Sequence, residues 1–443
     1  MPLAYRRAPI LLLAFLIGAN TQLIADITSG PMLSHVEMRE ASVWLQTDTT
    51  TKVRVAYAEE GKKNALKWSN LVQTNNDYDH TANITLDAVE PGKHYNYRIE
   101  LNGKLQTPLN TFATPTNFQG HTPPPDLRIA LGGAHYVAED GFEPPYQTLG
   151  GGYRIFSTIL EADPDLMIWT GNTAHLRASD WSSQSGTLKR FSKARSVAEL
   201  QPLLASIPHY ATWSNSDYST SNAGHHYSFR QNVEKCFNAF WPRPVEITAL
   251  EGIATRFRRS DVDFFMLDVR SYRDDIPTSD RLPQILGHKQ IEWLRQEILR
   301  STATFKIIIA GAPILNPADN RNNLSHASRE QTKLLQMLRN ERISGVFFIS
   351  GSKDYGELTK LEHAGSYNLY DLTLGPLTAN PLEDPNELNF FRIPGSSTYE
   401  RHFALIDFTG TESDRQLTIR VMGMDGKKLW KRTIKASQLQ HSH

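Results

Sequence analysis

The residues best suited to chemistry lie in four short loops, each directly after an apolar run typical of a buried strand. The loops span residues 132–135, 171–175, 213–217 and 350–354. Loops at the carboxyl ends of strands converge in an open α/β sheet, so we expect these four to surround one cleft. A pair of cations there would need anionic oxygen, thiolate or neutral imidazole ligands. Ser, Asn and Gly predominate instead, which predicts a polar cleft with little capacity for cations.

The ionisable side chains of these loops offer an alternative metal site. They are His135, His175, Asp217 and Asp354. Two imidazoles and two carboxylates suit a single Zn²⁺ or Fe²⁺ ion. The competing interpretation is that each histidine shares hydrogen bonds with nearby backbone or faces solvent, the commoner fate of a loop histidine. We favour the competing interpretation and keep the metal set as the alternative.

Two basic side chains suggest that the cleft could bind an anion. Arg270 and Lys353 are candidate contacts for a phosphate, helped by the backbone amides of residues 132–133. The alternative is that Arg270 pairs with a carboxylate such as Asp268 or Asp274 and that Lys353 is solvated. The partners predicted in this way are a phosphate-containing small molecule or an unidentified protein.

Composition describes an ordinary globular protein without a preference for charged partners. The chain has 443 residues, 40% of them hydrophobic, and its 47 basic residues balance 47 acidic ones. This length can hold two domains. Because no net charge draws the chain to a polyanion, we expect no nucleic-acid partner.

The N-terminus has the organisation of a secretory signal. A pair of arginines precedes an apolar run at residues 10–17, and candidate cleavage positions follow Ala19 and Ala25. The run is too short to span a bilayer, so no membrane span is expected. We therefore predict a signal peptide at residues 1–25 and a mature protein that is periplasmic or secreted.

The next segment predicts a small domain followed by a linker. Residues 26–114 alternate apolar and polar positions in short runs, with turn signals at Pro91-Gly92 and Asn102-Gly103. This pattern is typical of an antiparallel β-sandwich. Residues 115–125 are rich in Pro, Thr and Gly and predict an interdomain linker.

Residues 126–443 predict a larger α/β domain. Apolar runs typical of strands buried on both faces occur at residues 127–131, 166–170, 209–213, 264–268, 305–310 and 346–350. Amphipathic stretches predict helices at residues 152–162, 198–205, 232–241, 289–300 and 329–339. The alternation favours an α/β fold with a central sheet. Residues 403–408 and 416–423, with no helix between them, predict an added antiparallel hairpin.

Several passages resemble the alkaline phosphatase D family of metallophosphoesterases. They lie at residues 162–169, 200–213, 264–273, 286–294, 345–351 and 370–373. The resemblance extends over nearly the whole chain. It implies a four-layer αββα metallophosphatase-like domain preceded by a small fibronectin type III-like β-sandwich. It also implies a binuclear metal centre that holds iron with calcium or another divalent ion.

The family's ligand positions are substituted in the first two loops. The family pattern Gly-Ser-Cys is replaced by residues 132–134, and Ala134 has no donor atom. In the second loop, Asn172 stands where the family has an aspartate, and His175 occupies a tyrosine position. An asparagine offers a neutral carbonyl oxygen but no charge.

The other two loops have lost more of the pattern. The substituted ligand positions are Ser214, Asn215 and Ser216 in the third loop, and Ser352 and Asp354 in the fourth. The family patterns there are Trp-Asp-Asp-His-Asp and Ser-Gly-Asp-Arg-His. Asp217 alone matches an acidic position of these patterns.

These substitutions predict a chain that keeps the fold without the chemistry. A structural zinc site is worth only about 10–16 kcal/mol, so the loss of several ligands removes most of the stabilisation of a bound ion. Without cations, no metal-bound hydroxide forms at neutral pH. We expect no resident metal and an exported, non-catalytic binding or scaffolding protein. The alternative is a divergent metal-dependent phosphatase or phosphodiesterase that uses the rebuilt four-residue set.

Overall fold

The computed structural model describes residues 25–62, 65–139, 141, 143, 150–220, 222–275, 282–318, 320–382 and 387–441. The predicted signal peptide lies outside these ranges except for Ala25. Across the described ranges, every helix is too short or too polar to cross a bilayer.

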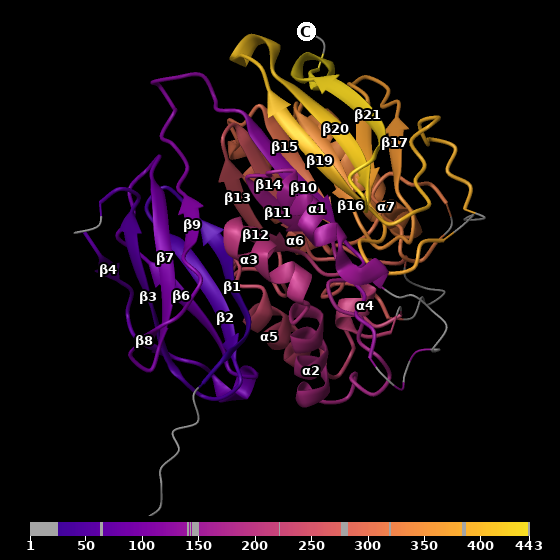
Figure 1. Ribbon diagram of the computed structural model, residues 1–443. Helices are drawn as coiled ribbons and strands as arrows, with labels where there is room; N and C mark the ends of the chain where they lie inside the picture. Colours follow the sequence, from indigo (N-terminus) through magenta and orange to yellow (C-terminus); the bar gives the residue numbers. More distant parts are fainter. Residues whose placement is uncertain are drawn as a thin grey trace, which may run out of the picture.

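The N-terminal strands form two antiparallel sheets that face each other (Figure 1). One has the order β1-β2-β6, with β1 (Ile27–Val36), β2 (Ala41–Thr47) and β6 (Thr81–Leu86). The other has the order β4-β3-β7-β8, with β5 beside β3 and β9 beside β7. Its strands are β3 (Lys52–Glu59), β4 (Lys67–Trp68), β5 (Val72–Gln73), β7 (His94–Leu101), β8 (Lys104–Leu105) and β9 (Asn110–Ala113). Alternate residues of both sheets fill one core, among them Val43, Val55 and Tyr97. The turn between β7 and β8 has positive φ at Asn102 and Gly103, as a two-residue type I′ hairpin requires.

The larger part of the chain contains two six-stranded sheets. The first has the order β12-β11-β10-β19-β20-β21: β10 (Leu127–Gly132), β11 (Leu166–Trp169), β12 (His209–Ala211), β19 (His402–Thr409), β20 (Gln416–Gly423) and β21 (Lys428–Lys435). The second has the order β13-β14-β15-β16-β18-β17: β13 (Thr255–Arg259), β14 (Val262–Leu267), β15 (Phe305–Ala310), β16 (Val346–Ser350), β17 (Glu357–Leu361) and β18 (Leu369–Thr373). The single central sheet expected from the apolar runs is thus two sheets, because runs buried on both faces do not reveal which strands pair.

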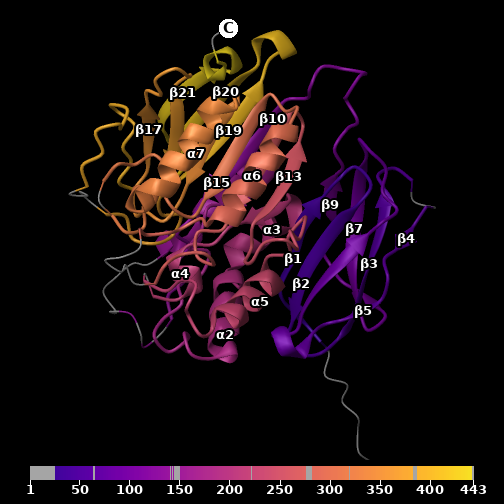
Figure 2. The same cartoon turned by 180° about the vertical axis from the view of Figure 1, so that it is seen from behind.

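Helices cover the outer face of each sheet, which makes four layers. Alternate residues of β10 and β11 face opposite ways: Ile129 and Ile168 join a core shared with the second sheet, whereas Met167 and Trp169 join a core with the helices outside the first. Those helices are α1 (Ile155–Glu161), α2 (Gln184–Arg195), α3 (Gln201–Ser206) and α5 (Arg230–Phe240). The outer face of the second sheet is covered by α6 (His288–Arg300) and α7 (Ser328–Asn340), as Figure 2 shows.

The C-terminal strands extend the first sheet. β19 pairs antiparallel with both β10 and β20, as the missing helix between β19 and β20 predicted. The additional strand β21 was not predicted, because its alternation of lysine and apolar residues is weak. Helix α2 was also missed, since arginines occupy two of its buried positions, Arg190 and Arg195.

Arg195 joins the sandwich to the helices. Its guanidinium lies 4.8 Å from the ring centroid of Trp44 in β2 and 3.8 Å from that of Trp241, and it donates to the Phe240 carbonyl at 3.0 Å. Burial lowers its pKa to about 9, so it stays charged at neutral pH.

We expect Arg195→Ala to lower the free energy of unfolding by about 3 kcal/mol, because it removes two cation–π contacts and leaves a cavity. Urea denaturation measures the effect. Lys193→Ala, an exposed change half a turn away, is the control and should stay within about 0.5 kcal/mol of the parent. An Arg195→Ala variant as stable as this control would contradict the role of the guanidinium.

Candidate functional site

The four polar loops meet at the carboxyl ends of β10, β11, β12 and β16. The first contacts the second through the His135 amide, which donates to the Asn172 carbonyl at 2.8 Å. The second contacts the third through the Asn172 side chain, which accepts from the Ser216 amide at 2.9 Å. The third contacts the fourth through Ser352 Oγ and Asn215 Oδ1, 3.0 Å apart. The structure therefore brings the four predicted loops together at one place.

The loops are packed closely against each other. A Cβ atom on Gly351 would lie 2.0 Å from the carbonyl oxygen of Thr170, so only glycine fits there. Ala134, Asn172 and Ser352 have φ values of 51°, 54° and 67°, a left-handed backbone that costs non-glycine residues roughly 1–2 kcal/mol each. Three of the substituted positions thus have a left-handed backbone, and Ala134 among them has no side-chain atom that could ligate a metal.

Asp217 is a structural cap. The short helix α4 (Asn215–Tyr218) begins after Ser214, and the Asp217 carboxylate turns back to accept from the Ser214 amide at 2.9 Å. It also accepts from the Asn172 amide at 2.6 Å, the Ala174 amide at 2.9 Å and the Thr173 hydroxyl at 2.8 Å. Burial raises its pKa to about 6, against the effect of these donors. Its match to the family pattern therefore does not require a metal.

The side-chain oxygens next to Asp217 are also hydrogen-bonded to protein groups. Ser214 Oγ donates to the Gly311 carbonyl at 2.6 Å, and Asn215 Oδ1 lies between the Ser214 and Ser352 hydroxyls at 3.2 and 3.0 Å. This neutral chain of hydroxyl and amide groups lies where the family resemblance places charged ligands.

His135 points away from the loops into the apolar core. Its Nε2 lies 2.8 Å from the Ala194 carbonyl, and its Nδ1 lies 2.9 Å from the Thr378 hydroxyl. Its ring packs edge-on against Phe156 and Trp169, at centroid distances of 5.2 and 5.8 Å. Burial lowers its pKa to about 4, so the ring is neutral, and Nε2 carries the proton because the Ala194 carbonyl can only accept. Nε2 therefore has no lone pair for a metal, and Nδ1 lies against the Thr378 hydroxyl.

The remaining members of the alternative metal set lie apart. His175 Nδ1 is 3.1 Å from the His135 carbonyl, and its ring packs edge-on against Tyr136. Asp354 is exposed. Within the described ranges, no group of three or more His, Cys, Asp or Glu side chains could hold a metal ion. The donors present therefore fit neither the single ion of the alternative interpretation nor the binuclear centre that the family resemblance implies.

The two predicted anion contacts are engaged with protein groups. Lys353 Nζ donates to both carboxylate oxygens of Glu387 at 2.7 Å, and burial lowers its pKa. The alternative in which Lys353 is solvated does not hold either, because Lys353 is buried. Arg270 donates to the Thr220 carbonyl at 3.1 Å beside the ring of Tyr218, and burial lowers its pKa to about 9.

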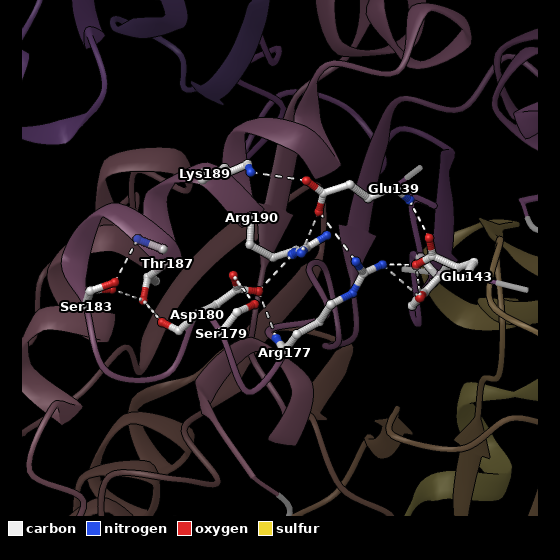
Figure 3. A network of polar contacts seen from close by, with 11 residues as sticks. Glu139, Glu143, Arg177, Ser179, Asp180, Ser183, Thr187, Lys189 and Arg190 are labelled. Carbon is white, nitrogen blue, oxygen red and sulfur yellow. Dashed lines mark hydrogen bonds and ion pairs between the residues drawn. The ribbon is translucent and has the colours of Figure 1, made fainter. Parts of the chain in front are cut away.

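Sequence reasoning missed an ion-pair network beside the first two loops (Figure 3). Glu139, which follows the first loop, binds Arg190 of α2 at 2.9 Å and Arg177, which follows the second loop, at 3.4 Å. Asp180 binds Arg190 at 3.0 Å, and Glu143 pairs with Arg177. These partners are up to 51 residues apart, so no local pattern signals them. The network holds α2 against the loops.

Comparison with known proteins identifies the family. The family model of the PhoD-like phosphatases matches residues 131–392, more than half of the chain, and a domain of unknown function, DUF7800, matches residues 24–119. No curated protein matches the sequence.

Two solved structures share the fold across nearly the whole chain. The structure of PhoD is 14% identical, with a TM-score of 0.72, and the match covers 93% of this chain and 91% of that one. Purple acid phosphatase PPD1 from yellow lupin (Lupinus luteus) seeds is 13% identical, with a TM-score of 0.65, covering 91% and 74% respectively. From the family model and the two-sheet architecture together, we conclude that the chain belongs to the PhoD-like phosphatase family.

Proposed function

We propose that this chain is a non-catalytic member of its family, exported through a cleaved signal peptide, that acts as a binding or scaffolding protein. In this proposal the N-terminal sandwich at residues 26–114 is fibronectin type III-like, residues 115–125 are the linker, and residues 126–443 carry the altered site. The partner is a phosphate-containing small molecule or another protein.

The observation that carries the proposal is that the side chains able to ligate a metal are already hydrogen-bonded within the protein. The Asp217 carboxylate already accepts four hydrogen bonds, and both His135 nitrogens are engaged. A cation would have to break these bonds and leave buried donors unpaired, at about 1–3 kcal/mol each. The alternative enzyme with a rebuilt site requires this rearrangement.

Metal analysis and hydrolysis assays test the proposal. We expect protein purified from metal-replete medium to contain no stoichiometric metal. We also expect no hydrolysis of p-nitrophenyl phosphate or bis(p-nitrophenyl) phosphate above a protein-free control with added Fe, Ca, Mn or Zn.

Two variants outside the core make the assay decisive. His175→Ala and Asp354→Asn remove members of the alternative set, and neither side chain is fully buried. Metal-dependent turnover in the parent that falls at least tenfold in either variant would establish the rebuilt enzyme and refute the proposal.

A further inference from the structure

A cavity of about 360 Å³ lies at the opposite end of the strands from the four loops. Its lining includes Leu127 at the start of β10, Asp165 directly before β11 and Pro208 directly before β12. Three separate segments close it: the β1–β2 turn, the chain between β9 and β10, and the β13–β14 turn. The sandwich and the α/β part therefore both contribute walls.

Hydrogen bonds hold these walls together. Arg259 at the end of β13 donates to the Val36 carbonyl of β1 at 3.0 Å. Ser260 and the buried Arg415 both donate to the Pro125 carbonyl at 2.7 Å. Pre-formed cavities of about 300–1,000 Å³ lined mainly by apolar groups are typical small-molecule sites. This cavity falls at the small end of that range.

The cavity has a compact apolar surface. Its apolar lining includes Met38, Phe112, Pro115, Phe118 and Ile207. A dry cavity of about 150 Å³ is large enough to bind benzene, so the observed volume admits one aromatic ring with a short polar substituent.

The charged lining is unevenly balanced. The cavity is lined by three carboxylates, those of Glu37, Asp126 and Asp165, and by two guanidiniums, those of Arg258 and Arg259. Their sum is one net negative charge. Arg258 is bound to Asp263 at 2.7 Å, and Asp126 is bound to Arg415 at 3.1 Å. Asp165 accepts from a backbone amide at 2.7 Å.

Glu37 shares its compensating charge, because the single guanidinium of Arg259 acts on both the Glu37 and the Asp165 carboxylates. Within the described ranges, its ion-pair partner is His35, whose Nε2 lies 3.9 Å from the Glu37 carboxylate. Burial lowers the pKa of His35 to about 4, so this ring is neutral at pH 7. Burial also raises the pKa of the half-buried Glu37, and the positive charge of Arg259 offsets part of that rise. A cation beside Glu37 would relieve this cost.

We propose that this cavity binds a small amphipathic amine, with its ring against Phe112, Pro115 and Phe118 and its ammonium group on the Glu37 carboxylate. The ligand contacts both parts of the chain, so its binding stabilises their arrangement. The proposal does not depend on whether the loops at the other end of the sheet have catalytic activity.

Matched ring compounds with different head groups test the proposal on the mature chain. Benzylamine, benzyl alcohol and phenylacetate have similar size and differ in charge. We expect benzylamine to raise the melting temperature saturably and to bind at least fivefold more tightly than the other two by calorimetry. Glu37→Gln should weaken the binding of benzylamine at least fivefold. Glu362→Gln, at an exposed position, should leave that affinity unchanged.

Two results would overturn the proposal. One is equal or tighter binding of benzyl alcohol or phenylacetate, and the other is unchanged benzylamine affinity in Glu37→Gln. The melting temperature of each free variant is measured first, so a folding defect is not mistaken for lost binding.

Discussion

Asp217→Asn should lower the free energy of unfolding by about 2–5 kcal/mol, although it changes a single atom of the side chain. The Asn172 and Ser214 amides both donate to Asp217 Oδ2, at 2.6 and 2.9 Å. An asparagine that turns its NH₂ group toward them brings donor against donor, and turning it the other way places it against the Ala174 amide and the Thr173 hydroxyl. Each buried donor left without an acceptor costs about 1–3 kcal/mol.

Urea denaturation followed by circular dichroism measures this effect. Asp354→Asn makes the same chemical change at an exposed site in the fourth loop and should stay within about 0.5 kcal/mol of the parent. If Asp217 served a metal instead, removing its charge would alter metal content and leave the stability of the metal-free chain close to that of the parent. That result would refute the capping role.

Acidification from pH 7 to pH 4 should destabilise the fold by several kcal/mol, because the core holds neutral histidines. Burial lowers the pKa of His135 and His402 to about 4 and that of His209 to about 3, from an ordinary value of 6.5. Below pH 6.5 these histidines bind protons in the unfolded chain but stay neutral in the folded chain. Stability is therefore lost as the pH falls from 6.5 toward 4, on the order of 3 kcal/mol for each histidine.

Buried carboxyl groups act in the opposite direction, and Asp371 is the clearest case. Burial raises its pKa to about 6 from 3.8, so the folded chain binds its proton first as the pH falls. It adds stability between pH 6 and 3.8, about 2 pKa units, which is less than the combined shift of the three histidines. His35 and His175, whose pKa burial also lowers to about 4, add to the loss, so the net change on acidification is a loss.

Urea concentrations at the midpoint of unfolding, measured at pH 7.0, 5.5 and 4.5, test this prediction. His209 lies 3.1 Å from both Trp169 Nε1 and the Leu203 carbonyl, contacts that glutamine can share without titrating. His209→Gln should therefore be less sensitive to acid than the parent, whereas His121→Gln, at an exposed position, should follow the parent. A parent midpoint that is constant from pH 7.0 to 4.5 would contradict the prediction.

The local sequence determined the strands, the position of the polar loops and the identity of the substituted ligands. Apolar runs such as residues 305–310 and 346–350 coincide with β15 and β16 because a strand buried on both faces needs nothing beyond its own residues to be recognised. Ala134 lacks a donor atom in any fold, so this loss was readable from the residue alone.

Only the tertiary structure decided what the remaining polar groups do. Asp217 closes on Asn172, 45 residues away, and His135 turns to Thr378, 243 residues away. Lys353 meets Glu387 rather than solvent. Sequence spacing does not predict such pairings, because a buried polar group takes whichever partner the packed chain brings within hydrogen-bonding distance. The same residues that suggested a metal set from their types became caps and core contacts once their partners were in place.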